Sequence, residues 1–393
     1  MNKVTIERSH RLDGIGEYYF SRKLREISEI EAATGRQIIR LAMGSPDLPP
    51  HQSVIDRLAQ EAQRPDVHKY MSYQGEPILR KAFADWYKRY YNVDVDFRSE
   101  VLPLLGSKEG LMHICQTFLN VGDKVLVPNP GYPTYSAAVK LSGGVMVTYS
   151  LNKETGFLPD FEAIEAAGLE GVKMMLVNYP NMPTGQTPTP DLFEKLVAFG
   201  AKHNILIIHD NPYSFVRNPQ PMSILQVEGA MEVAMELNSL SKGHSMAGWR
   251  VGAIFAKKEW IDAILCFKSN MDSGMFYPMQ AAAAVALTEL GEEWYNDLNA
   301  MYREREKLAF EMLDLLGCKY NREQAGLFVW ARMPEGEEDC FAFSDKILYN
   351  CDVFITPGAI FGSEGQKYIR VCLCAPEVKF IKAIEKIRKG LKL

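Results

Sequence analysis

The sequence predicts an α/β fold: a doubly wound, mainly parallel seven-stranded sheet, joined to a smaller α+β domain. Two observations carry this prediction. Between residues 101 and 255, short apolar runs alternate with helix-like stretches, which is typical of a parallel sheet flanked by helices. After about Met279, long helices with a few strands between them replace this alternation. The 393 residues are enough for two domains with a core each.

Seven runs are predicted as strands of the large sheet, because each is short and rich in β-branched or large apolar side chains. They are Val101–Leu105, Lys124–Val127, Gly144–Tyr149, Met174–Val177, Ile205–Ile208, Val233–Leu237 and Val251–Phe255. Between them, the spacing of apolar residues predicts helices over Lys108–Leu119, Phe161–Ala167 and Asp191–His203, the last with Pro190 at its start.

The second unit begins with an alanine-rich stretch, Gln280–Leu290, and a long amphipathic helix, Glu292–Leu316. Three strands and two helices are expected after it: Gly326–Ala331, Val353–Thr356 and Tyr368–Leu373, and Ser344–Tyr349 and Pro376–Leu391. We therefore expect an N-terminal arm that forms part of the small domain (1–45), a large domain (46–280) and a small C-terminal domain (281–393). No long Gly/Ser linker separates them, so they should pack together.

Composition excludes several classes of function. Lys and Arg number 44 against 49 Asp and Glu, a net charge of −5, so nucleic acid is not an expected partner. The seven cysteines form no Cys-x-x-Cys pair, and the histidines lack metal-ligand spacing, so we expect neither a disulfide scaffold nor a metal site. The polar N-terminus and the lack of a long apolar run predict a cytoplasmic protein without a membrane partner.

The most informative motif is Ser-Leu-Ser-Lys at residues 239–242, followed by Gly-Trp-Arg-Val-Gly at 248–252. Lys242 follows a predicted buried strand, where loss of solvent would lower its pKa and make its amine a nucleophile. Ser239 and Arg250 are the donors that a phosphate group would need beside it. Taken alone, Lys242 fits a solvated loop lysine about as well.

These two motifs resemble the cofactor-lysine signature of the class I/II pyridoxal-phosphate aminotransferases, which have fold type I. The resemblance implies pyridoxal 5'-phosphate as cofactor, attached to Lys242 as an aldimine, with Ser239 and Arg250 at its phosphate. Five further motifs follow the family's order, and together they cover about residues 44–370.

Within the large domain, the resemblance assigns roles to two more groups of residues. Asp210 ends a strand and would pair with the nitrogen of the pyridine ring, while Tyr213 would bond the ring's phenolic oxygen. The Gly-Ser-Lys turn between a strand and a helix suits an anion, and by family position Ser107 and Lys108 belong to the phosphate loop. Tyr132 would stack on the ring.

Three residues are assigned to the substrate and to the neighbouring subunit by the same resemblance. Arg370, on a late strand, would grip the substrate's α-carboxylate, a bidentate task that suits a guanidinium. Gly44 would place its backbone against the substrate. Tyr70 matches the family's tyrosine that reaches the cofactor phosphate of the neighbouring subunit, which implies a homodimer.

One position departs from the family. The family usually has Asn-Pro-Thr-Gly, whose Asn bonds the phenolic oxygen, but Met182 stands at that position here. Methionine is a weak acceptor and no donor. Either the preceding Asn181 reaches the oxygen, which we favour, or Tyr213 supports it alone.

The sequence therefore predicts a pyridoxal-phosphate-dependent aminotransferase that moves an α-amino group between an amino acid and a 2-keto acid, with Lys242 as the general base. The alternative is a β-eliminating C–S lyase on the same fold, since fold does not decide which bond breaks. A non-catalytic regulatory domain is disfavoured, because no DNA-binding segment precedes the motifs. The donor stays open, and the family's habits favour a polar or dicarboxylic one.

Overall fold

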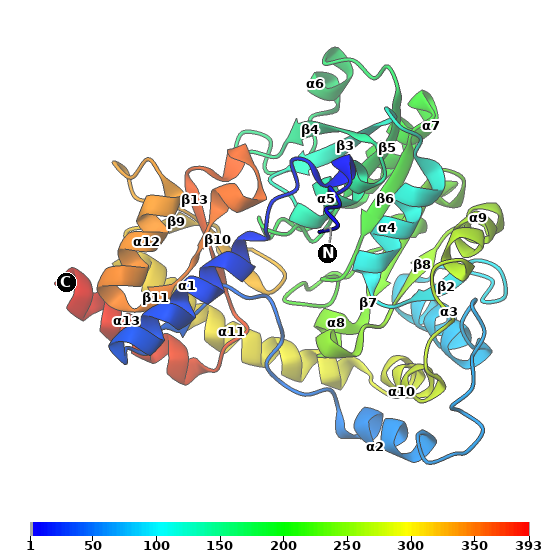
Figure 1. The fold of residues 1–393 in the computed structure, drawn as a ribbon, viewed down its shortest axis with the longest axis horizontal. Helices are drawn as coiled ribbons and strands as arrows, with labels where there is room; N and C mark the ends of the chain where they lie inside the picture. Colours follow the sequence, from blue (N-terminus) through cyan, green and yellow to red (C-terminus); the bar gives the residue numbers. More distant parts are fainter. Residues whose placement is uncertain (1–2, 393) are drawn as a thin grey trace.

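The computed structural model describes residues 3–392, which form two units joined along one long helix, α11 (Glu292–Leu315) (Figure 1). The larger unit is built on a seven-stranded sheet with the order β2-β8-β7-β6-β5-β3-β4. Its strands are β2 (Val101–Leu104), β3 (Lys124–Asn129), β4 (Val145–Ser150), β5 (Val172–Val177), β6 (Leu206–Asp210), β7 (Ala234–Ser239) and β8 (Gly252–Phe255). Only β8 runs antiparallel to its neighbours. The predicted sheet is confirmed, with strand ends within two residues of those expected.

Apolar side chains point to both faces of the large sheet, which explains why helices cover both faces. Leu102, Val125 and Met174 point to one apolar core, while Val101, Leu126 and Met175 point to the other. Since successive side chains of a strand face opposite sides, each strand serves both cores. Helices α4 (Ser107–Phe118), α5 (Pro133–Leu141) and α9 (Lys258–Ser269) cover the first face, and α3 (Pro77–Tyr91), α7 (Pro190–His203) and α10 (Tyr277–Thr288) the second.

Some helices were not expected from the sequence. No prediction covered α5, which begins at Pro133; a proline fits the first position of a helix as well as a turn, so this residue alone predicts neither. No prediction covered α2 (Gln52–Glu61), α3 or α9. The predicted helix over Phe161–Ala167 is α6 (Phe161–Ala166), and a short α8 (Leu240–Gly243) follows β7 directly.

The smaller unit combines both ends of the chain. Its four-stranded sheet has the order β12-β13-β10-β9, and a parallel pair joins β1 (Ile39–Arg40) to β11 (Val353–Phe354). The remaining strands are β9 (Lys319–Tyr320), β10 (Phe328–Arg332), β12 (Thr356–Pro357) and β13 (Tyr368–Cys372), and the helices are α1 (Tyr19–Thr34), α12 (Cys340–Cys351) and α13 (Glu377–Leu391). The described part of the chain also contains six short 3-10 helices: His10–Leu12, Ile224–Gln226, Ala230–Glu232, Ala247–Trp249, Gly358–Phe361 and Ser363–Gly365.

The hydrophobic cores of the two units meet within α11. Helix α10 packs on α2 and α3 and belongs to the core of the large unit, which extends to Tyr295. From Leu298 onward, α11 contributes to the core of the small unit, which also contains Phe20 and Ile27 from α1. Among residues 3–392, no helix combines the length and the hydropathy that crossing a bilayer requires.

Candidate active site

A cavity of about 400 Å³ lies where the carboxyl ends of the large sheet face the small unit. Most of the residues predicted for the site line it: Gly44, Ser107, Lys108, Tyr132, Asp210, Tyr213, Ser239, Lys242, Arg250 and Arg370. Ligands gather at this edge of open α/β sheets because the strands' ends and the loops after them converge there. A second cavity, of about 320 Å³, is lined by none of the predicted residues.

Lys242 follows β7 by three residues and is carried by α8, whose first turn is capped by the Ser239 side chain. Its Nζ donates a hydrogen bond to the backbone oxygen of Gly44 over 2.6 Å. Loss of solvent is the main cause that lowers the pKa of the Lys242 ammonium, and the nearby guanidinium groups of Arg370 and Arg250 lower it further. A neutral amine, capable of attacking a carbonyl and of accepting a proton, is therefore easier to form here than in water.

Asp210 is the last residue of β6, and its carboxylate is only half satisfied. Oδ2 accepts a hydrogen bond from the Tyr135 hydroxyl at 2.9 Å, whereas the buried Oδ1 has no partner. Burial raises the pKa of Asp210 to about 6, although the Tyr135 hydroxyl opposes that rise. A buried acceptor without a partner is costly, so Oδ1 is suited to a cationic N–H that enters the cavity.

The first turn of α4 provides a cradle for an anion. Gly106 has φ +87°, and a Cβ there would collide with the guanidinium of Arg250. Arg250 Nη1 also donates to Ser241 Oγ over 3.3 Å, and Ser239 Oγ donates to the same oxygen over 2.9 Å. Ser107 begins the helix, so its free backbone N–H groups and helix dipole join these hydroxyls in favouring a phosphate.

An amine, an unpartnered carboxylate oxygen and an anion cradle in one cavity match the functional groups of pyridoxal phosphate. Two aromatic residues add to this fit. Tyr132 lines the cavity with its ring 5.6 Å from that of Tyr135, and Tyr213 lines it with a buried hydroxyl whose pKa burial raises. The residues present therefore fit the cofactor that the sequence resemblance implied.

Arg370 lies on β13 at the small-unit side of the cavity and is buried. Its Nη2 donates to the backbone oxygen of Ala42 at 2.9 Å, and Nη1 lies 3.1 Å from the sulfur of Met182. Its Nε has no partner. The guanidinium lies 3.7 Å from the ring centre of Phe328. A buried cation with an unused donor and a weak sulfur contact is suited to receive a carboxylate.

The structure does not bring Asn181 into the cavity. Its amide nitrogen donates to the backbone oxygen of Asn178 over 3.1 Å, and its Oδ1 accepts a 2.7 Å bond from the Thr184 hydroxyl. Met182 lines the cavity instead, beside Arg370. The expectation that Asn181 reaches the ring oxygen thus has no geometric support, because the turn uses both ends of its amide.

Tyr70 also lies outside the cavity of its own chain. Its side chain is 85% exposed, and Tyr73 in the same segment is exposed as well, as are Met271 and Phe276 between α9 and α10. The ring of His68 lies 6.0 Å from that of Phe276, which places these residues on one surface. Such exposure of large apolar side chains is typical of a surface that another chain covers.

Several cavity residues had no role assigned from the sequence: Tyr18, Phe20, Met43, Tyr135, Asn178, Phe328 and Phe361. Asn178 directly follows a predicted strand, a position that could have identified it. Phe328 and Phe361 carried no signal, because a single phenylalanine in a core-forming segment is indistinguishable from any other.

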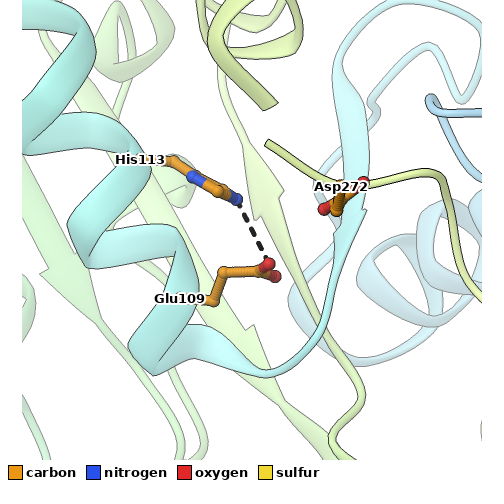
Figure 2. A group of neighbouring side chains, drawn as sticks. All are labelled: Glu109, His113 and Asp272. Atoms are coloured by element: carbon orange, nitrogen blue, oxygen red, sulfur yellow. Dashed lines mark ion pairs between the residues drawn. The ribbon is translucent and has the colours of Figure 1, made fainter. Parts of the chain in front are cut away.

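Outside the cavity, Glu109, His113 and Asp272 place three possible metal-ligand atoms within 4.8 Å of one another (Figure 2). His113 is fully buried, and its Nε2 lies 3.4 Å from a Glu109 oxygen. The Lys268 ammonium already bonds both oxygens of Asp272 at 2.7 Å. Because this buried cation neutralises Asp272, we assign the group to two neighbouring ion pairs, one within α4 and one at the end of α9.

Comparisons with known proteins agree with this geometry. The family description "Aminotransferase class I and II" matches residues 36–387. An LL-diaminopimelate aminotransferase of Aquifex aeolicus is 39% identical over 390 residues, covering 99% of this chain and 100% of the relative. The Bacillus subtilis apo-BacF structure has a TM-score of 0.94 at 35% identity, over 99% of each chain. A Thermus thermophilus aspartate aminotransferase double mutant has a TM-score of 0.91 at 25% identity, over 98% of this chain and 100% of the other.

Proposed function

Because this chain belongs to the class I and II aminotransferases, we propose that Lys242 moves the protons of its reaction and that Arg370 holds the substrate's carboxylate. The enzyme depends on pyridoxal 5'-phosphate and moves an α-amino group between an amino acid and a 2-keto acid. The alternative of a β-eliminating C–S lyase receives no support from the family match or from the relatives' names.

The cavity residues suited to each part of the cofactor indicate where it would bind. Pyridoxal phosphate supplies an electrophilic carbon for amines and a ring that withdraws electrons from the substrate's Cα. Asp210 Oδ1 would accept a hydrogen bond from the N–H of the pyridine ring. The phosphate would be held by Ser107, Lys108, Ser239 and Arg250. Tyr132 would cover the ring, and Tyr213 would face the ring's phenolic oxygen. The observation that carries this proposal is the unpartnered Oδ1 in the same cavity as the Lys242 amine.

Lys242 would act as the general base at the substrate's Cα. Its lowered pKa leaves the amine able to accept the Cα proton, and the same group can return the proton to another carbon. Arg370 and the Gly44 backbone would orient the substrate, since both line the cavity and Gly44 already contacts Lys242. LL-diaminopimelate, named as the substrate of the Aquifex relative, is one candidate donor.

We also propose a homodimer in which Tyr70 reaches the phosphate of the neighbouring site. The exposed Tyr70, Tyr73 and Phe276 support this, because water would leave all three side chains if a second copy covered them. A cytoplasmic location is our further proposal. It is supported by the seven cysteines, which are all free thiols.

The Lys242→Ala variant tests the proposed role. We expect it to bind pyridoxal phosphate without covalent attachment and to lose about 10³-fold or more of its transamination rate, since the base is gone. The assay measures glutamate formed from 2-oxoglutarate with a mixture of amino acids as donors. Lys258→Ala, which removes an exposed lysine of α9, is the control and should keep its rate. Turnover by Lys242→Ala near the wild-type rate would refute the assignment.

A further inference from the structure

The second cavity lies between the two units, and it shares none of its described lining residues with the active-site cavity. Lys153 and Phe157 come from the loop between β4 and α6, Gly185 from the turn after β5, and Trp330 and Tyr368 from β10 and β13 of the small unit. Phe157 packs against the hydrophobic cores of both units. Small-molecule sites are common at such boundaries, and a volume of about 320 Å³ is within their size range.

Flat aromatic rings form part of this lining. The rings of Trp330 and Tyr368 stack with their centres 5.0 Å apart and their planes at 7°. From the large unit, the ring of Phe157 meets that of Tyr368 edge-on, with 6.1 Å between the centres. The indole Nε1 of Trp330 is buried and has no hydrogen-bond partner in the described structure. A buried donor without a partner is costly, so this residue favours a ligand that combines a ring with a hydrogen-bond acceptor.

The charged part of the lining is mainly cationic. Lys153, Lys319 and Arg332 line the cavity together with one carboxylate, that of Glu323. Lys319 pairs with Glu335 over 3.0 Å, but both side chains are exposed, so this pair is weak. Lys153 and Arg332 form no ion pair within the described part of the chain. These two cations belong to different units, so an anion bound between them would be attracted by both.

The surface that we propose a second copy covers does not include this cavity. Tyr70, Tyr73 and Phe276, whose exposure supports the homodimer, are not among the residues that line it. The rings and the cations described above all come from one chain. By that proposal, the ligand chemistry of the second cavity does not depend on the neighbouring subunit.

We propose that the second cavity is a binding site for a small aromatic carboxylate, distinct from the substrate. Its ring would pack among Trp330, Tyr368 and Phe157, and its carboxylate would lie between Lys153 and Arg332. A neutral aromatic molecule would leave the two cations unpaired, and an aliphatic carboxylate would leave the rings uncovered. This binding involves no covalent step and no turnover.

Calorimetric titration of the holoenzyme with naphthalene-2-carboxylate tests the ligand class. Two matched probes are naphthalene-2-carboxamide, which lacks the charge, and acetate, which lacks the rings. We expect the aromatic carboxylate to bind about tenfold or more tightly than either of them, because only it uses both the cations and the rings. Equal affinities for the carboxylate and the carboxamide would overturn the inference, since the cations would then not recognise the ligand.

A double variant places the binding in this cavity. Lys153→Ala combined with Arg332→Ala removes two exposed side chains, so the protein should fold and keep its transamination rate. One binding event per chain should weaken by about tenfold or more, because both cations are gone. The control combines Lys258→Ala with Arg388→Ala, which removes an exposed lysine and an exposed arginine elsewhere, and should bind the probe as the wild type does. Unchanged binding in the cavity variant would place the probe elsewhere, as at Arg370, and would overturn the inference.

Discussion

At the scale of single residues, burial shifts the pKa values of the two main ionisable groups of the site, Asp210 and Lys242. The Asp210 carboxyl has an ordinary pKa of 3.8, and burial raises it to about 6 because the surrounding core favours the neutral form. Lys242 is affected in the opposite direction by the same cause, since its neutral form is the amine. Desolvation thus prepares both groups before any ligand arrives.

Asp210→Asn should stabilise the cofactor-free protein at pH 8. The folded pKa lies above the unfolded one, so ionised Asp210 opposes folding, by about 3 kcal/mol once the pH exceeds 6. The difference between variant and wild type should shrink as the pH falls from 6 and vanish below 3.8. Urea denaturation at pH 8 and at pH 4 measures it. A less stable variant at pH 8 would show that burial does not raise this pKa.

Met182→Asn tests whether the site lacks an amide donor. A donor beside the cofactor's phenolic oxygen favours its ionised form, so the pKa read from the visible absorbance of the bound cofactor should fall by about one unit. Val121→Asn, at a residue that is 89% exposed, is the control for the added amide. An unchanged pKa in Met182→Asn would mean that the native site already supplies such a donor.

At the scale of elements, helix ends and strand ends position the chemistry. Asp210 ends β6, Ser239 ends β7 and Ser107 begins α4, so three separate elements bring their ends to one cavity. The buried ion pair between Lys268 and Asp272 has a different task, because it fastens the end of α9 beside His113 of α4. Such pairs hold elements in place even when their net contribution to stability is small.

Helix α9 offers a matched comparison of a buried and an exposed ion pair with the same spacing of four residues. Lys268→Met should destabilise the protein by about 3–5 kcal/mol, because it removes a buried cation and leaves the partly buried Asp272 carboxylate without a partner. Lys258→Met breaks the exposed pair with Asp262 and should cost about 0.5 kcal/mol or less. Chemical denaturation measures both. Equal losses would mean that the Lys268 pair is not buried in solution.

At the scale of the whole molecule, the cavity joins the two units of the chain and, by our proposal, two copies of it. Gly44 and Arg370 come from the small unit, whereas Lys242 and Asp210 come from the large one. Tyr70 lies on the surface, away from this cavity. An active site that needs a residue from the neighbouring copy would be incomplete in a single chain.

Complementation between inactive variants tests the role of Tyr70 in the neighbouring site. Tyr70→Ala and Lys242→Ala should each be impaired alone. In hybrid dimers formed by refolding an equal mixture, one site recovers both residues, so the mixture should regain about a quarter of the wild-type activity. Refolding each variant separately is the control. No recovery in the mixture would show that Tyr70 does not act across a dimer.

The sequence by itself determined the seven strands, three of the helices between them (α4, α6 and α7) and the type of chemistry. Those features depend on local periodicity and on short motifs such as the serines around Lys242. Both can be recognised in the sequence without knowing which distant segments are in contact. The position of Asp210 at the end of a strand could also be predicted, since the end of an apolar run is visible in the sequence.

Only the tertiary structure decided where side chains point and which distant segments meet. The turn after β5 engages the amide of Asn181 and leaves Met182 in the cavity, and α10 joins the large unit because α2 and α3 cover it. In the cavity, the ring of Phe20 meets those of Phe328 and Phe361, which follow it by more than 300 residues in the sequence. Side-chain direction and long-range docking follow from packing the whole chain at once, and no local pattern records that packing.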